Sequence, residues 1–230
     1  MGGAPKTIIS MKKALIAVAM IAATMTANAQ QEVGQISLQP KFGISLATLS
    51  ENENSNDFAQ KYGITVGVEA MYQASKNLGV SVGLQYAMQG ASVVNQYDSY
   101  YSDESNNSQN IKLKYDYINI PLLANLYIAK GLAIKTGVQF GYLVGANKGY
   151  NEFKRSSYGS GDREISRKSE SVIDDCEKFD VSIPVGLSYE ISNLVFDARY
   201  TYGLTETAKE AFNYAKNRVF SFTVGYKFGL

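Results

Sequence analysis

Apolar and polar residues alternate with a period of two along most of the chain, which predicts β-strands with one apolar and one polar face. The clearest case is the last segment, where every second residue from position 220 to position 230 is aromatic or aliphatic. Ser221, Thr223 and Lys227 lie on the opposite face of the same segment. No helical period fits this series, so the end of the chain is predicted to be a strand.

The same alternation recurs in eight segments, separated by connections that are alternately short and long. The segments are 36–48, 64–72, 78–88, 111–128, 132–146, 179–191, 194–204 and 220–230. The short connections are 74–77, 129–131 and 191–193, and the long polar ones are 50–60, 90–110, 147–178 and 205–217. An even number of strands joined in this way is typical of membrane-spanning β-barrels, with short turns on one side and longer loops on the other. The predicted fold is therefore all-β: an eight-stranded antiparallel up-and-down transmembrane barrel with four longer extracellular loops.

Segment 111–128 departs from the pattern. Lys112, Lys114 and Asp116 share their parity with the apolar Ile118 and Ile120. A β-bulge near 116–118 would exchange the two faces, since one extra residue reverses the alternation beyond it. Alternatively, the first part of the segment projects beyond the membrane, where its facing matters less.

The polar faces of six of the other seven segments carry charges, whereas the apolar faces are almost free of charge. A soluble barrel or sandwich would show the same alternation with the apolar face inward, but charges enclosed in a lumen favour the membrane barrel. Eight strands leave an interior just wide enough for side chains, so these charges must pair to offset their desolvation. We therefore predict a plugged interior with a balanced network of four basic and four acidic residues. They are Lys41, Glu69, Lys135, Asp180, Glu190, Asp197, Arg199 and Lys227.

The amino-terminal residues are predicted to be an export signal. Lys12 and Lys13 precede an apolar run at 14–23, and Ala27-Asn28-Ala29 has the small-x-small pattern of a cleavage site. The apolar run is about half the roughly 20 residues that a membrane-spanning helix needs. Residues 1–29 are therefore expected to be a leader and cleaved signal peptide, and 30–230 the barrel domain of an outer-membrane protein.

Composition argues against several function classes. The chain has no His, which is the commonest catalytic base and metal ligand. Removal of the leader takes away Lys6, Lys12 and Lys13 and leaves 19 of the 22 basic residues against 21 acidic ones, so no basic surface for nucleic acid is expected. We expect no enzymatic activity, cofactor or metal. The acidic residues of the third long connection, Asp174 and Asp175 with Asp162 and Glu164, are interpreted as solvated charge rather than a divalent cation site.

Two further features belong to the long connections. Tyr97, Tyr100 and Tyr101 lie among Ser, Asn and Asp, a mixture that makes adaptable binding surfaces because Tyr offers large contact area at low entropic cost; it is equally compatible with an ordinary solvated loop. Cys176, the single cysteine, is either an available thiol or merely buried near the barrel rim, and we favour the second interpretation.

Short motifs over nearly the whole mature chain carry a family resemblance. They are YINIPLL at 117–123, TG at 136–137 with GYL at 141–143, FD at 179–180 with GLSYE at 186–190, ARYTYGLT at 198–205, and NRVF at 217–220 with GYKF at 225–228. In these motifs the chain resembles the PorT-like outer-membrane β-barrel domain proteins. The resemblance implies the barrel, in a functionally mixed family whose founding member resembles a component of the type IX secretion system.

Three functions therefore stay open at this stage. The first is a structural or surface-exposed barrel that binds a ligand or partner through its loops, and the second is an accessory component of a secretion machine. The third, a lipid-modifying outer-membrane enzyme, is disfavoured by the missing His. The partners expected in every case are outer-membrane lipid and the barrel assembly machinery, with an extracellular or envelope protein partner left open.

Overall fold

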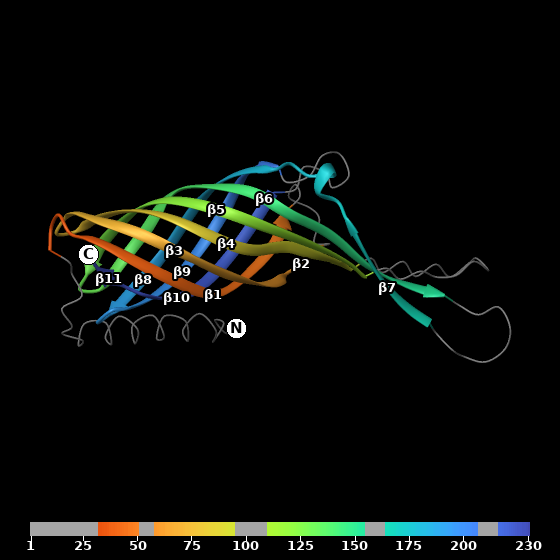
Figure 1. The fold of residues 1–230 in the computed structure, drawn as a ribbon, viewed down its shortest axis with the longest axis horizontal. Coiled ribbons are helices and arrows are strands. Elements are labelled where there is room, and N and C mark those ends of the chain that lie inside the picture. Colours follow the sequence, from red (N-terminus) through yellow and green to blue (C-terminus); the bar gives the residue numbers. More distant parts are fainter. Residues whose placement is uncertain (1–31, 51–57, 95–109, 155–163, 207–215) are drawn as a thin grey trace, which may run out of the picture.

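The computed structural model describes residues 32–50, 58–94, 110–154, 164–206 and 216–230, and eight of its strands form a closed barrel wall (Figure 1). Each wall strand pairs antiparallel with the next, and β10 pairs with β1 to close the sheet. The predicted eight-stranded antiparallel barrel is thereby confirmed. The wall strands are β1 (Ile36–Ser50), β3 (Lys61–Ser75), β4 (Leu78–Val94), β5 (Asn110–Ala129), β6 (Leu132–Lys154), β8 (Phe179–Ile191), β9 (Leu194–Glu206) and β10 (Lys216–Tyr226).

The other described elements are three short strands, each paired with a wall strand, and one 3₁₀ turn. The short strand β2 (Phe58–Ala59) pairs with β4, and β11 (Phe228–Gly229) continues β10 and pairs with β1. Strand β7 (Glu164–Ser171) pairs with the outer part of β6, and a 3₁₀ turn, η1 (Ile173–Asp175), follows it. None of the helices in the described residues has the length and apolar character needed to cross a membrane.

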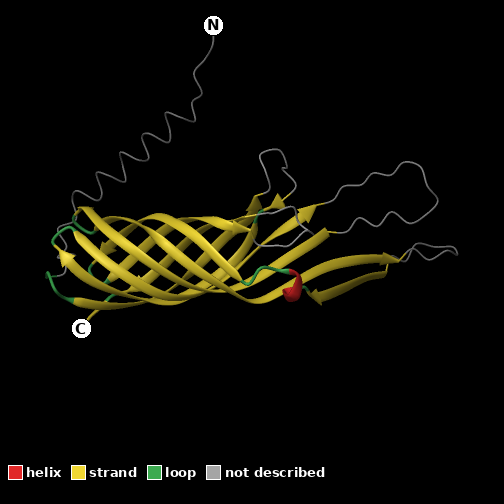
Figure 2. Cartoon of the chain, turned by 90° about the horizontal axis from the view of Figure 1, so that it is seen from above, coloured by secondary structure: helices red, strands yellow, loops and turns green. Residues whose placement is uncertain are grey.

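The two ends of the barrel differ, as Figure 2 shows. The tight β3–β4, β5–β6 and β8–β9 connections lie at one end, called the turn end, and the long connections lie at the other, called the loop end. Left-handed backbone conformations close two of the turns, at Gly131 (φ 76°) and Ser192 (φ 57°). The three short connections therefore lie at the positions that the alternation of apolar and polar residues predicted.

The third long connection contains more regular structure than the sequence predicted. β6 continues to Lys154, and its residues from Asn147 onward pair with β7. This hairpin, called the projecting hairpin, extends beyond the barrel mouth (Figure 1). The sequence placed 147–178 in a long polar connection, and the paired strands within it were missed because their residues show no regular alternation of apolar and polar types.

The predicted change of face in β5 was also wrong. Its odd-numbered residues face the interior along the described strand, from Leu113 through Tyr117 to Tyr127. The irregularity lies in the partner strand, since Asp116 pairs with Gly145 and Tyr117 with Leu143, leaving one extra residue in β6. Lys112, Lys114 and Asp116 therefore stay on the outer side near the loop end, as the alternative interpretation had it.

Apolar side chains cover the outer surface of the wall and charged ones lie inside. Phe42 and Leu84 are 69% and 54% exposed, whereas Lys135 and Arg199 inside the barrel are 4% and 3% exposed. Exposed aromatic residues occur at both ends of this surface, Tyr72 and Phe228 near the turn end and Tyr62 and Phe179 near the loop end. An apolar band flanked by aromatic girdles is the arrangement of a membrane-spanning barrel.

Candidate functional site

A network of ion pairs centred on Glu69 fills the barrel interior towards the turn end. Glu69 is on the inner face of β3, and its Oε2 accepts from Lys41 Nζ at 2.5 Å and from Arg199 Nη2 at 3.5 Å. Its Oε1 accepts from Lys135 Nζ at 3.0 Å. Asp197 is the second carboxylate, with its Oδ2 2.9 Å from Lys135 Nζ and 3.0 Å from Arg199 Nη2. We call these five residues the Glu69 network.

The Glu69 network spans the lumen. Around the closed sheet, β6 lies three strands from β3 in one direction and β9 lies three strands away in the other. Lys135 and Arg199 must therefore reach across the interior to contact the same carboxylate. Because all five side chains are at most 5% exposed, the pairs occupy the cross-section instead of lining a water-filled channel.

Hydrogen bonds support these charges. Ser81 Oγ donates to Glu69 Oε1 at 3.0 Å and in turn accepts from Asn125 Nδ2 at 3.0 Å. Removing charges from water costs several kcal/mol per ion, and these hydrogen bonds add to the ionic attraction that offsets this cost. The Nε of Arg199 has no hydrogen-bond partner within the described residues. Three cations and two carboxylates leave the Glu69 network with one net positive charge.

The other predicted interior charges lie outside this network. Lys227 Nζ and Glu190 Oε2 form a separate pair at 2.6 Å near the turn end. Asp180 lies nearer the loop end, where Thr205 Oγ1 donates to its Oδ1 at 2.9 Å, and within the described residues it makes no ion pair. The structure thus buries all eight predicted charges and places seven of them in ion pairs.

A small polar void separates the Glu69 network from the loop end. Its volume is about 10 Å³, and Gln85, Gln139, Arg199 and Thr201 are among its lining residues. A void of this volume has room for about one water molecule.

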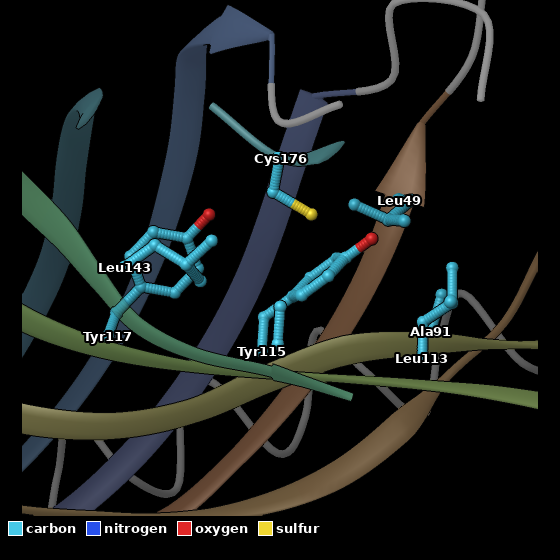
Figure 3. Close-up of a cluster of buried hydrophobic side chains, with 8 residues drawn as sticks. Leu49, Ala91, Leu113, Tyr115, Tyr117, Leu143 and Cys176 are labelled. Carbon is cyan, nitrogen blue, oxygen red and sulfur yellow. The ribbon is translucent and has the colours of Figure 1, made fainter. Parts of the chain in front are cut away.

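A second, apolar layer lies inside the barrel nearer the loop end, and Figure 3 shows its side chains. Leu113, Tyr115 and Tyr117 of β5 point inward and pack in one buried cluster with Leu143 and Cys176. The remaining members of this cluster, here called the apolar plug, are Leu49, Ala91 and Ala146, with Val172 and Ile173 packed against it.

The segment after β7 is held down onto the mouth of the barrel. The N–H of Val172 donates to the carbonyl of Ala146 at 3.0 Å, and the N–H of Leu143 donates to the carbonyl of Lys178 at 2.8 Å. These bonds bring Ile173 and Cys176 against the buried tyrosines. Cys176 is 5% exposed and forms no disulfide, which confirms its predicted burial near the rim.

The apolar plug was missed by sequence reasoning, although a signal for it was present. Leu113, Tyr115 and Tyr117 continue the odd parity of Asn119 and Asn125, so unbroken alternation would have placed them inside. The predicted binding residues Tyr97, Tyr100 and Tyr101 lie outside the described residues. So does Asp162, and the described residues contain no group of three potential metal ligands.

Glu69→Gln is expected to lower the free energy of unfolding by roughly 3–5 kcal/mol. The substitution leaves three buried cations beside one carboxylate, so the lost attraction no longer offsets their desolvation. Urea unfolding of the barrel in phospholipid vesicles measures the effect.

Glu206→Gln, at an exposed position of β9, is the matched control and should change stability by less than about 1 kcal/mol. Adding Lys135→Met to Glu69→Gln restores the original net charge of the Glu69 network and should recover part of the loss. Equal stability of Glu69→Gln and the wild-type protein would contradict the role assigned to Glu69.

Comparison with known proteins places the chain in a family. Residues 28–209 match the family model described as outer membrane protein beta-barrel domain. No curated protein gives a significant match.

Solved barrels are similar at low identity. The attachment invasion locus protein Ail of Yersinia pestis, in complex with the heparin analogue sucrose octasulfate, has 15% identity and a TM-score of 0.45, covering 86% of this chain and all of Ail. Neisserial surface protein A has 14% identity and a TM-score of 0.39, covering 84% and 95% of the two chains. Family membership rests on the sequence model: the chain belongs to the outer membrane protein beta-barrel domain family and is a protein of the cell outer membrane.

Proposed function

We propose that this protein is a closed, surface-exposed barrel that acts by binding a ligand or protein partner at its loop end, and not by passing solutes through its lumen. The observation that carries the proposal is the double closure of the interior. The Glu69 network crosses the lumen towards the turn end, and the apolar plug fills it nearer the loop end. The side chains of the Glu69 network and of the apolar plug are buried, which supports the closed lumen proposed here.

The loop end offers the surface for binding. The projecting hairpin extends beyond the barrel mouth (Figure 1), and among the described strands β7 pairs only with β6. Such an edge leaves backbone N–H and C=O groups available to an added strand. The connection that contains Tyr97, Tyr100 and Tyr101 leaves the barrel at the same end, between β4 and β5, and supplies further candidate contact residues.

The direction of insertion supports a cell-surface role. In bacterial outer-membrane barrels the short turns face the periplasm and the longer loops face outward. By this rule the projecting hairpin lies on the extracellular side. The signal peptide proposed at 1–29 would deliver the chain to this compartment, and the barrel assembly machinery would insert it.

A role as an accessory component of a type IX-like secretion machine is the second candidate, and it rests on the resemblance to PorT-like proteins. Enzymatic modification of lipid is less well supported. The chain has no His, and three of the four predicted interior carboxylates, Glu69, Glu190 and Asp197, are engaged in ion pairs. We propose a non-enzymatic barrel that works without a cofactor.

The purified barrel in planar lipid bilayers is expected to give no discrete conductance steps, because each of the two layers closes the lumen. Tyr115→Ala combined with Tyr117→Ala opens the apolar plug but leaves the Glu69 network in place, so this variant should stay closed too. A porin in the same bilayer is the positive control, and reproducible steps from the wild-type barrel would refute the closed lumen.

Deletion of residues 97–109 is expected to reduce the capture of a surface ligand or envelope partner at least severalfold. Chemical cross-linking on intact cells, followed by recovery of the barrel and mass spectrometry, measures the capture. A deletion of 208–214 in another long connection is the control.

If deletion of residues 97–109 leaves the capture of a ligand or partner unchanged, the hypothesis that these residues bind it is wrong. Recovery of the other subunits of a secretion machine with the wild-type barrel would establish the second candidate instead of the first.

A further inference from the structure

An apolar groove lies on the outer face of the barrel near the turn end. It crosses β3, β4 and β5 and has a volume of about 540 Å³. Ala70 and Ala124 are its smallest outward-facing lining residues, and Tyr72, Val82 and Leu122 are among the larger ones. The outer wall is therefore not smooth here but recessed.

The recess follows from where the small residues fall in the strand register. Ala70 of β3 is paired with Val82 of β4, and Ala124 of β5 is paired with Val80. The two alanines therefore lie diagonally across two consecutive outward positions of β4. On the opposite wall, Ala198 of β9 stands between the bulky outward residues Phe196 and Tyr200, and none of these three lines the groove.

Two lysines lie on the rim next to the groove. Lys76 is in the β3–β4 turn and Lys130 is in the β5–β6 turn, and both are exposed. The turns are close together, because the carbonyl of Asn77 accepts the N–H of Tyr127 at 2.9 Å. Glu32 precedes β1 beside the end of β3, where the N–H of Gly34 donates to the carbonyl of Gln73.

We infer that this groove is a binding site for one anionic phospholipid, with an acyl chain lying over Ala70 and Ala124 and the phosphate held between Lys76 and Lys130. The inference rests on the outer face meeting lipid, and it adds a specific place and headgroup chemistry. An acyl chain in the recess gains dispersion contacts on several sides, which a flat wall does not offer. Lysines next to the membrane surface attract anionic headgroups, and Tyr72, between groove and rim, is at the depth where aromatic side chains mark the interface.

The test is native mass spectrometry of the full barrel, purified in mild detergent and exposed to equal amounts of phosphatidylglycerol and phosphatidylcholine. The wild-type protein should retain one phosphatidylglycerol in preference to phosphatidylcholine. Ala70→Leu combined with Ala124→Leu fills the groove and should reduce retention of either lipid by about tenfold, equivalent to about 1.4 kcal/mol. Lys76→Gln combined with Lys130→Gln should abolish the preference for phosphatidylglycerol while the groove still takes a chain.

Matched controls separate this site from the general lipid coat. Ala198→Leu adds the same volume on the opposite wall, and Lys178→Gln removes an exposed charge near the loop end; both should behave like the wild-type protein. Heat-dependent gel mobility verifies that every variant is folded.

Equal retention by the groove-filled variant and Ala198→Leu would overturn the inference. A dimer that disappears on filling the groove, without any retained lipid, would also overturn it, because the groove would then be an interface between two copies. The closed lumen and the loop-end binding proposed above would stand in either case.

Discussion

The structure depends on one constraint: a charged side chain in the membrane-spanning wall must point inward and must find a partner there. On the lipid face near the midplane a Lys or Arg costs about 2–4 kcal/mol, and inside eight strands there is little room for water. Glu69 is the buried partner of three cations at once: Lys41 of β1, Lys135 of β6 and Arg199 of β9. The same contacts that stabilise the wall therefore also close the lumen.

The barrel interior changes character along its length because lipid contact constrains only the outer face. Towards the turn end, ions and amides fill the lumen, while nearer the loop end Leu113, Tyr115 and Tyr117 fill it with the help of the segment after β7. Two chemically different layers in series support a protein that acts at its surface and not through its lumen. The function proposed for the loop end follows from this division.

The strands and the interior charges could be predicted because both follow from a period of two that lipid imposes on one face. All eight charged residues taken from the polar faces are buried. The failures lie where lipid no longer constrains the pattern. Asn147 to Lys154 form a ladder with β7 although their sequence lacks a regular alternation. The extra residue near Asp116 is in β6, although the unusual sequence is in β5. Which cation contacts which carboxylate depends on side-chain reach across the lumen, which alternation within a strand does not encode.

The most direct measurement of the central claim uses the absence of Trp from the chain. A single reporter, Phe222→Trp, is placed on the outer face of β10 and its fluorescence is measured in vesicles whose acyl chains carry bromine. The account predicts strong quenching by the brominated lipid and almost none by aqueous iodide. Quenching by iodide with no effect of the brominated chains would show that this face does not meet lipid, and would contradict the account.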